Sequence, residues 1–269
     1  MPAKPSSEPR REVMGGLAKG LQVLLALGQQ TRGLTLSEVA GLAHLPAATA
    51  RRCLHTLEEL GYVTRAGRCF VLRPKVLELG AAYLQAINVE ALTQTHLERL
   101  AHETGDSAAL SVLDGVDIVY IARASARTLV RLEAHVGSRF PAYPTSMGRV
   151  LLAGLRPAGL RKYLAEASFR ALTEHTVTQR TQLARRIEDC RRTGYAAVAD
   201  ELAYGVVAVA VPVLDEAGRV VAALNSSSHS KKVSAAELVR QRLGKLQEIA
   251  RQISGELRRV PGLSLSAQS

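Results

Sequence analysis

Short helical patterns separated by tight stops fill the first part of the chain. Apolar residues recur at helical spacing in residues 16–30. A second pattern begins at Thr35, which can form a capping box with Glu38 three residues later. Pro46 suits the first turn of a third helix, because its missing N–H is not needed there, and Gly61 suits the left-handed position that ends it. The sequence therefore predicts three short helices in succession.

A β-ribbon is predicted directly after the third helix. Apolar and polar residues alternate on both sides of a turn at Ala66 and Gly67. Helix, helix, tight turn, helix and ribbon, in this order, form a winged helix-turn-helix. The third helix of such a module buries one face and inserts the other into the major groove of DNA. We therefore expect contacts to bases and phosphates from Ala47, Ala48, Thr49, Arg51, Arg52, His55, Arg65 and Arg68.

The helical pattern continues through residues 75–104, with apolar residues on more than one face. This distribution indicates that part of the segment packs against a second chain as well as its own core. Helix-turn-helix modules also read paired half-sites in DNA. Both features favour a homodimer or a tetramer.

From residue 107 the apolar pattern changes from helical spacing to alternation. Helices are expected to begin at caps on Ser146, Thr178 and Ser234. Strands that pair largely antiparallel are predicted in residues 107–123, 128–143, 195–201, 205–215 and 219–229. Together these elements predict an α/β domain, a sheet flanked by helices.

The charge balance points to a polyanionic partner. The 269 residues carry a formal net charge of +11, and the isoelectric point is about 10.0. Such a balance favours nucleic acid or an anionic membrane surface, although an arginine-rich composition alone produces the same number. The N-terminal residues lack the apolar core of a signal peptide, and no apolar run is long enough to cross a membrane. We therefore expect a cytoplasmic protein with no membrane partner.

Motifs for catalysis and metal binding are missing from the sequence. It contains no GxSxG elbow, Walker loop, GxGxxG or HExxH motif. Its three cysteines form no CxxC pair, so neither a zinc site nor a disulfide framework is expected. An enzyme is therefore disfavoured, and no cofactor is predicted. A purely architectural DNA-binding protein is disfavoured too, because that role needs only the basic module.

Several stretches resemble the IclR family of transcription factors. They are "GLAKGLQVLLAL", "LTLSEVAGLAHLPAATARRCLHTLEELGYV", "PAYPTSMGRVLLA" and "GYAAVADELAYGVVAVAVPVLDEAGRVVAALNSSSH", within a match that runs from about Gly16 to Leu257. The last two blocks resemble the branch that controls aromatic-acid catabolism through the β-ketoadipate pathway. The resemblance implies a regulator whose action on operator DNA is controlled by an effector, a small aromatic or dicarboxylic acid. A regulator of another pathway, with a non-aromatic effector, is the alternative.

The resemblance also implies a domain plan. A winged helix-turn-helix and a GAF-like α/β effector-binding domain are expected, joined by a helical linker, and RNA polymerase is a candidate partner. The expected boundaries are a disordered tail at 1–14, the winged helix-turn-helix at 15–74, the linker helix at 75–91, the effector-binding domain at 92–260 and a disordered tail at 261–269.

The effector pocket is expected at the N-terminus of the helix that begins in "TSMGR". Free backbone N–H groups and the positive helix end bind a carboxylate without a dedicated cation. Arg123 and Arg131 lie near in sequence and are candidates for binding a hydroxyl or a second carboxylate. The family's pocket positions, with Tyr143 added on the same grounds of proximity, fall on Tyr143, Ser146, Met147, Val198, Ala208, Asn225 and Ser227.

Overall fold

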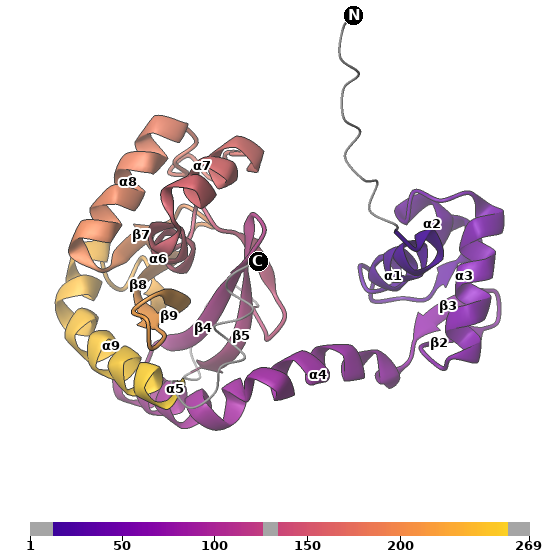
Figure 1. The fold of residues 1–269 in the computed structure, drawn as a ribbon, viewed down its shortest axis with the longest axis horizontal. Helices are drawn as coiled ribbons and strands as arrows, with labels where there is room; N and C mark the ends of the chain where they lie inside the picture. Colours follow the sequence, from indigo (N-terminus) through magenta and orange to yellow (C-terminus); the bar gives the residue numbers. More distant parts are fainter. Residues whose placement is uncertain (1–12, 126–133, 258–269) are drawn as a thin grey trace, which may run out of the picture. The chain divides into compact units, whose positions relative to one another are not determined.

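The computed structural model describes residues 13–125 and 134–257, which divide after Ala81 into two units (Figure 1). Helix α4 (Leu77–Ile87) crosses this division. The predicted tails lie almost wholly outside the described residues. Arg131 and the first half of the strand predicted at 128–143 lie outside them as well.

The first unit is a helical module with a small antiparallel sheet. Its strands follow the order β1-β3-β2 in the sheet. Along the chain, a 3₁₀ turn (Pro74–Val76) comes after β3. The elements are α1 (Gly15–Leu27), β1 (Leu34–Thr35), α2 (Leu36–Leu42), α3 (Ala47–Glu59), β2 (Val63–Ala66) and β3 (Cys69–Leu72). The predicted succession of three helices and a β-ribbon is confirmed.

Local chemistry explains where these helices begin and end. Thr35 Oγ1 accepts a hydrogen bond from Glu38 N at 3.4 Å, and Glu38 Oε2 accepts one from Thr35 N at 2.8 Å, so the predicted capping box is present. Gly61 has a φ of +80°, as the left-handed end of α3 requires. Pro46 was expected inside the first turn of α3, but it occupies the N-cap, because its ψ of 141° is extended.

The second unit is built on a six-stranded sheet of order β6-β5-β4-β9-β8-β7, with every described pair antiparallel. The predicted helix over 75–104 is broken: Asn88, at a φ of +46°, separates α4 from α5. The other elements are α5 (Val89–Thr104), β4 (Ser107–Asp114), β5 (Asp117–Ser125), β6 (Arg139–Pro141), α6 (Ser146–Gly154), α7 (Pro157–Glu166), α8 (Arg180–Thr193), β7 (Ala196–Ala199), β8 (Val206–Leu214), β9 (Val220–His229) and α9 (Ala235–Leu257).

Helices cover both faces of this sheet, and each face has its own core. Helices α5 and α9 pack on one face, and α6, α7 and α8 pack on the other (Figure 1). Side chains of β9 alternate between the two cores: Leu224 points toward α5 and α9, and Ala223 points toward α6. The residues after them, Asn225 and Ser226, continue this alternation, so Asn225 faces the side of α6.

Two predicted helix caps are wrong. Ser146 is the first residue of α6, and the cap is Thr145, whose extended backbone lets its side chain accept from Gly148 N at 2.9 Å. Helix α8 begins at Arg180 after an N-cap at Gln179 that makes no side-chain cap bond, so Thr178 lies too early in the chain. Helix α7 had no counterpart in the sequence prediction.

Candidate nucleic-acid interface and effector pocket

The outer face of α3 presents small residues followed by cations. Ala47 and Ala48 are exposed in the first turn, and Thr49 behind them is half-buried. Arg51 and Arg52 are exposed and form no ion pair with any residue that the structure describes. The opposite face of the helix, with Leu54 and Leu57, is buried in the core of the unit.

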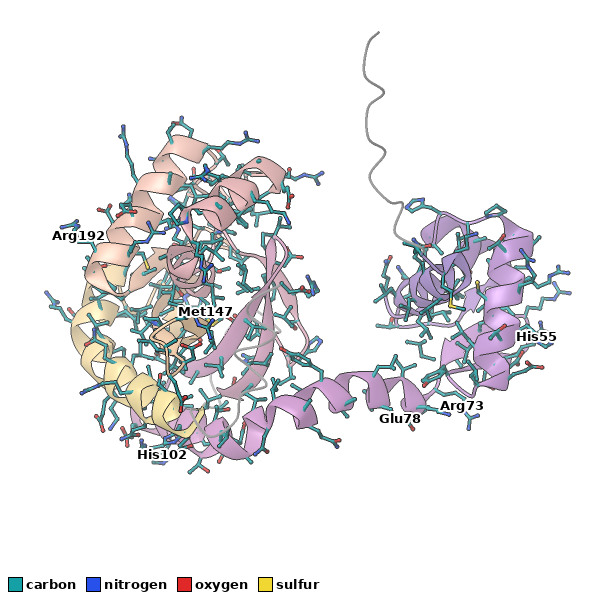
Figure 2. All side chains as sticks on the ribbon, in the orientation of Figure 1. His55, Arg73, Glu78, His102, Met147 and Arg192 are labelled. Atoms are coloured by element: carbon teal, nitrogen blue, oxygen red, sulfur yellow. The ribbon has the colours of Figure 1, made fainter. Side chains whose placement is uncertain are left out.

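His55 and the β-ribbon extend this basic surface. His55 lies on the outer side of α3 (Figure 2), where its Nδ1 is 3.7 Å from Glu59 Oε1. The Arg65 guanidinium stacks 5.1 Å from the centre of the Phe70 ring. Arg68 is exposed beside the turn at Gly67. All the residues predicted to contact DNA therefore lie on one unit, and most of them are exposed.

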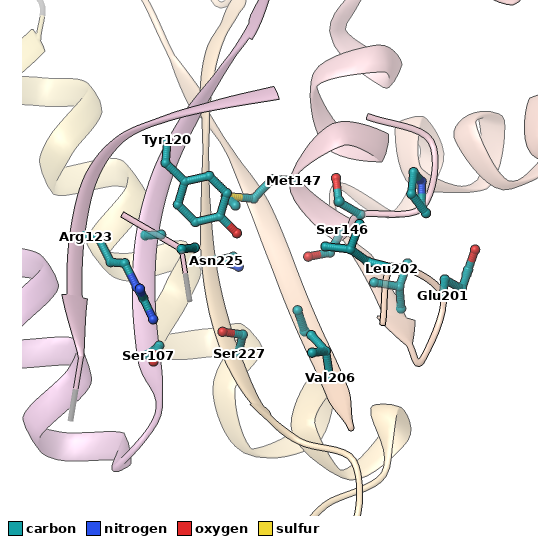
Figure 3. A pocket seen from close by; sticks show the side chains of 16 residues that line it. Ser107, Tyr120, Arg123, Ser146, Met147, Glu201, Leu202, Val206, Asn225 and Ser227 are labelled. Atoms are coloured by element: carbon teal, nitrogen blue, oxygen red, sulfur yellow. The ribbon is translucent and has the colours of Figure 1, made fainter. Parts of the chain in front are cut away.

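A pocket of about 590 Å³, including its opening, lies on the α6 side of the sheet. Figure 3 shows its side chains converging from the sheet, from the start of α6 and from the loop after β7. It is lined by Ser107, Ala109, Tyr120, Arg123, Ala134, Pro144, Thr145, Ser146, Met147, Val198, Glu201, Leu202, Val206, Ala208, Asn225 and Ser227. The lining combines apolar side chains with a few polar groups, which is typical of a small-molecule site.

The structure brings the predicted effector residues together at this pocket, with one exception. Tyr143 does not line it. The Tyr143 hydroxyl donates to Arg170 O at 2.6 Å, and its ring packs edge-on against Phe169. Its hydroxyl is therefore already used in holding the segment between α7 and α8. Arg123 does line the pocket.

The start of α6 offers free donors to the pocket. Thr145 Oγ1 accepts a hydrogen bond from Gly148 N, and Thr145 O accepts one from Arg149 N. The N–H groups of Ser146 and Met147 have no acceptor among the described residues. Two unused donors at the positive end of a helix are an arrangement that binds anions.

Asn225 supplies an independent indication of a ligand. The residue is 4% exposed, and its Oδ1 is buried without a hydrogen-bond partner within the described chain. A buried polar atom left unpaired costs about 1–3 kcal/mol, so such atoms are rarely left without a partner. Ser227 and Ser107 flank it on paired strands at the pocket wall. A ligand with polar atoms would complete these hydrogen bonds.

The balance of charges in the pocket wall is compatible with binding of an anion. Glu201 lines the pocket, but its Oε2 lies 2.6 Å from Nη2 of Arg149, which also donates through Nε to Tyr143 O. Burial lowers the pKa of Arg149, and the adjacent carboxylate opposes that shift. The Glu201 charge is thus compensated. Arg123 forms no ion pair with any described residue, so its charge remains available.

Tyr120 adds a neutral donor. Burial raises the pKa of its hydroxyl to about 12, and the nearby Arg123 opposes that shift. The phenol therefore keeps its proton near neutral pH and can donate to a ligand.

The sequence analysis did not identify several residues of this site, among them Tyr120, Thr145 and Glu201, which line the pocket, and Arg149, which pairs with Glu201. Alternation along β5 could not have identified Tyr120, because Tyr120 and Arg123 are three residues apart and a β-bulge at Ile121 brings both to the pocket side. Arg149 follows Ser146 by three residues, so the two lie on one face of α6, and this spacing could have indicated that Arg149 lies near the pocket. Glu201 lies in a loop, and only the tertiary fold brings it to Arg149. Within the described residues, no helix could span a membrane, and no cluster of His, Cys, Asp and Glu is built to hold a metal.

Comparisons with known proteins agree with this architecture. The family model "IclR helix-turn-helix domain" matches residues 16–67, and "Bacterial transcriptional regulator IclR C-terminal" matches residues 81–255. The chain is 40% identical to the Pca regulon regulatory protein of Pseudomonas putida, covering 91% of this chain and 85% of that protein. It is 32% identical to the p-hydroxybenzoate hydroxylase transcriptional activator of Acinetobacter baylyi, covering 92% and 94%.

A solved structure shows the same fold with an acid bound. It is an IclR homologue from Microbacterium hydrocarbonoxydans in complex with 4-hydroxybenzoate. The match has a TM-score of 0.79 at 26% identity and covers 91% of this chain and 99% of that chain. With both family models matched in order and relatives above 30% identity over most of the chain, this protein belongs to the IclR family of bacterial transcriptional regulators.

Proposed function

We propose that this chain is a DNA-binding transcriptional regulator of aromatic-acid catabolism genes, controlled by a small carboxylic acid. The observation that carries the proposal is the pocket, where the free amides of Ser146 and Met147 share one cavity with the unpaired Oδ1 of Asn225. The named relatives regulate genes of this kind, and one homologue holds 4-hydroxybenzoate. The chain acts by binding rather than by catalysis, in the cytoplasm, where bacterial DNA lies.

The pocket walls favour a partly flat, partly apolar acid over a very small keto acid. The effector's carboxylate lies on the amides at the start of α6. Val198 and Ala208 present methyl groups to its body, and Asn225 binds a polar substituent. Arg123 takes a hydroxyl or a second carboxylate at the β5 side. Burial of apolar surface with a few placed polar groups is typical of small-molecule sites.

Regulation requires that the effector bind two arrangements of the protein with different affinity. The residues proposed to contact DNA and the effector pocket lie in different units of the chain. We therefore propose that the segment containing α4 and α5 transmits the conformational change from the effector pocket to the DNA-binding unit.

The protein acts as a homodimer or a tetramer. The first unit carries an apolar row on α1, formed by Leu17, Leu21 and Leu25, which are 62%, 46% and 71% exposed. These residues lie four apart, so they form one stripe along the helix. A second copy of the chain would cover this stripe and place two copies of α3 on paired half-sites. RNA polymerase is proposed as a further partner at the promoter.

Ligand screening tests the proposed function directly. Each acid is added at about one hundred times its expected dissociation constant, which stabilises the folded protein by about 2.7 kcal/mol. We expect a rise in Tm with protocatechuate, para-hydroxybenzoate or β-ketoadipate, measured by thermal unfolding of the full chain. A rise with pyruvate or glyoxylate alone would favour the alternative pathway. No rise with any of these acids would contradict the proposed effector site.

Replacing Arg52 by alanine tests the DNA-binding surface. An arginine that contacts a base or a phosphate contributes about 1–3 kcal/mol, so operator affinity should fall by about 5- to 150-fold. Binding is measured by fluorescence anisotropy on a DNA sequence selected from a random library by the wild-type protein. The matched control is Arg185→Ala on α8, which removes another exposed arginine from the other unit. Equal losses in both variants, or a loss of effector affinity in Arg52→Ala, would contradict the assignment.

A further inference from the structure

Strand β9 carries polar side chains on both of its faces. Asn225 and Ser227 line the effector pocket. Ser226 lies between them and points to the opposite face of the sheet, where it is fully buried. Its hydroxyl donates to Asp106 Oδ2 at 3.1 Å. The strand that contacts the effector is therefore hydrogen-bonded through its back to a buried carboxylate.

Asp106 joins this strand to two helices. Arg242 of α9 donates from Nε to the same Oδ2 at 2.9 Å, and its Nη2 donates to Thr104 O at 3.1 Å. Thr104 is the last residue of α5. Thr104, Asp106, Ser226 and Arg242 together form what we call the Asp106 cluster. It ties the end of α5 to α9 and to the back of the pocket strand.

The cluster has the physical properties of a rigid connection. Asp106 is 6% exposed, and the Arg242 side chain is 22% exposed, so water competes weakly for their hydrogen bonds. Hydrogen bonds to an ionised carboxylate are stronger than those between neutral groups, and they gain strength where water is largely excluded. The backbone around Ser226 is held as well, because Ser226 of β9 pairs with Ala108 of β4 in the sheet. A movement of β9 relative to α5 and α9 therefore changes the hydrogen bonds of Asp106.

Helix α5 is linked to the first unit through α4, which precedes it in the chain. Only Asn88 separates the start of α5 from α4, which crosses the division between the units. A displacement of the end of α5 therefore acts on the segment that leads to the DNA-binding helices. This coupling does not require a direct contact between the effector and α5.

We infer that Asp106 is a positioning residue through which effector binding at β9 controls DNA affinity. This inference rests on the proposed function, since it concerns how the same pocket is coupled to the first unit. Effector contacts to Asn225 and Ser227 bias the position of β9. The Asp106 cluster passes that bias to the end of α5.

The test is the ratio of DNA dissociation constants measured with and without effector. The variant is Ser226→Ala, which cuts the connection to β9 but keeps the Asp106–Arg242 ion pair. The matched control is Ser228→Ala on the same strand and the same face, because Ser228 makes no side-chain hydrogen bond in the described chain. The full-length proteins are tested with protocatechuate, para-hydroxybenzoate and β-ketoadipate on DNA selected by the wild type. Circular dichroism verifies that each variant is folded, and calorimetry measures its affinity for each acid.

The wild-type ratio should lie in the range of about 5 to 150 that is typical of allosteric coupling. In Ser226→Ala the ratio should fall toward one, while acid affinity and DNA affinity without acid change less than about threefold, well below that coupling. Asp106→Asn should lower the ratio as well, and Ser228→Ala should keep it.

An unchanged ratio in Ser226→Ala, or an equal fall in Ser228→Ala, would overturn the inference and leave the proposed function standing. A wild-type ratio of one with all three acids would instead contradict the proposed function, and the inference would fall with it.

Discussion

Replacing Gly148 by alanine should weaken effector binding about a hundredfold or more. A Cβ atom at this position would lie 2.0 Å from Ala142 O and 2.5 Å from Ala142 Cα, and neither backbone atom can swing away. The first turn of α6 must therefore move, and the amides of Ser146 and Met147 move with it. Hydrogen bonds to a charged group contribute about 1.5–3 kcal/mol each, so losing both lowers affinity by about a hundredfold or more. Isothermal titration with the acid found by thermal screening measures this loss.

The matched control for this variant is Gly244→Ala in α9. A Cβ atom at Gly244 meets nothing within 4 Å, so only helix propensity changes. The control should be stabilised by roughly 0.5–1 kcal/mol and should bind the acid normally. Gly148→Ala should also lower Tm, because overpacking a buried contact costs about 1–3 kcal/mol. Wild-type acid affinity in Gly148→Ala would show that the carboxylate does not lie at the start of α6.

The helix positions in the first unit were predictable because local chemistry determines them. The capping box of Thr35 and Glu38 and the left-handed Gly61 depend only on residues close in the chain. The cap of α6 was placed one residue late, since Thr145 and Ser146 are both hydroxyl residues suited to that role. Their backbone angles decide between them, because Thr145 is extended and Ser146 is already helical.

The pocket residues on strands were predictable in a different way. Asn225 and Ser227 share a strand face by their spacing, and the family resemblance placed that face in a pocket. Tyr143 was included because it is close in sequence to Ser146, but the chain turns between them and directs its hydroxyl to Arg170. Glu201 was missed for the converse reason: its contact with Arg149 joins residues far apart in the sequence, which no local pattern can show.

Replacing Arg149 by methionine should destabilise the second unit strongly. Arg149 is 4% exposed, and its removal leaves the Glu201 carboxylate buried without its cation. Breaking a buried ion pair in this way costs about 3–5 kcal/mol. For a domain of this size, each kcal/mol lowers Tm by about 2–4 °C, so a fall of roughly 6–20 °C is expected. Calorimetry on the full chain measures the shift.

The exposed pair of Arg192 and Asp189 provides the control. Arg192 projects from α8 (Figure 2), and its Nη2 lies 3.1 Å from Asp189 Oδ1, with 76% and 57% of the two side-chain areas exposed. Arg192→Met should therefore cost no more than about 1 kcal/mol, because solvent screens exposed pairs. Adding Glu201→Leu to Arg149→Met should restore most of the lost stability, since the unpaired charge is then gone. A double variant as unstable as the single one would show that Arg149 stabilises the fold by packing rather than by charge.

The same series separates stability from effector binding. Glu201 lines the pocket, so its uncompensated carboxylate in Arg149→Met repels an anionic effector. Acid affinity should fall in the single variant and recover in the double variant, where no carboxylate remains. Acid affinity that does not change across the series would place the effector's carboxylate away from Glu201, at the Arg123 side of the pocket.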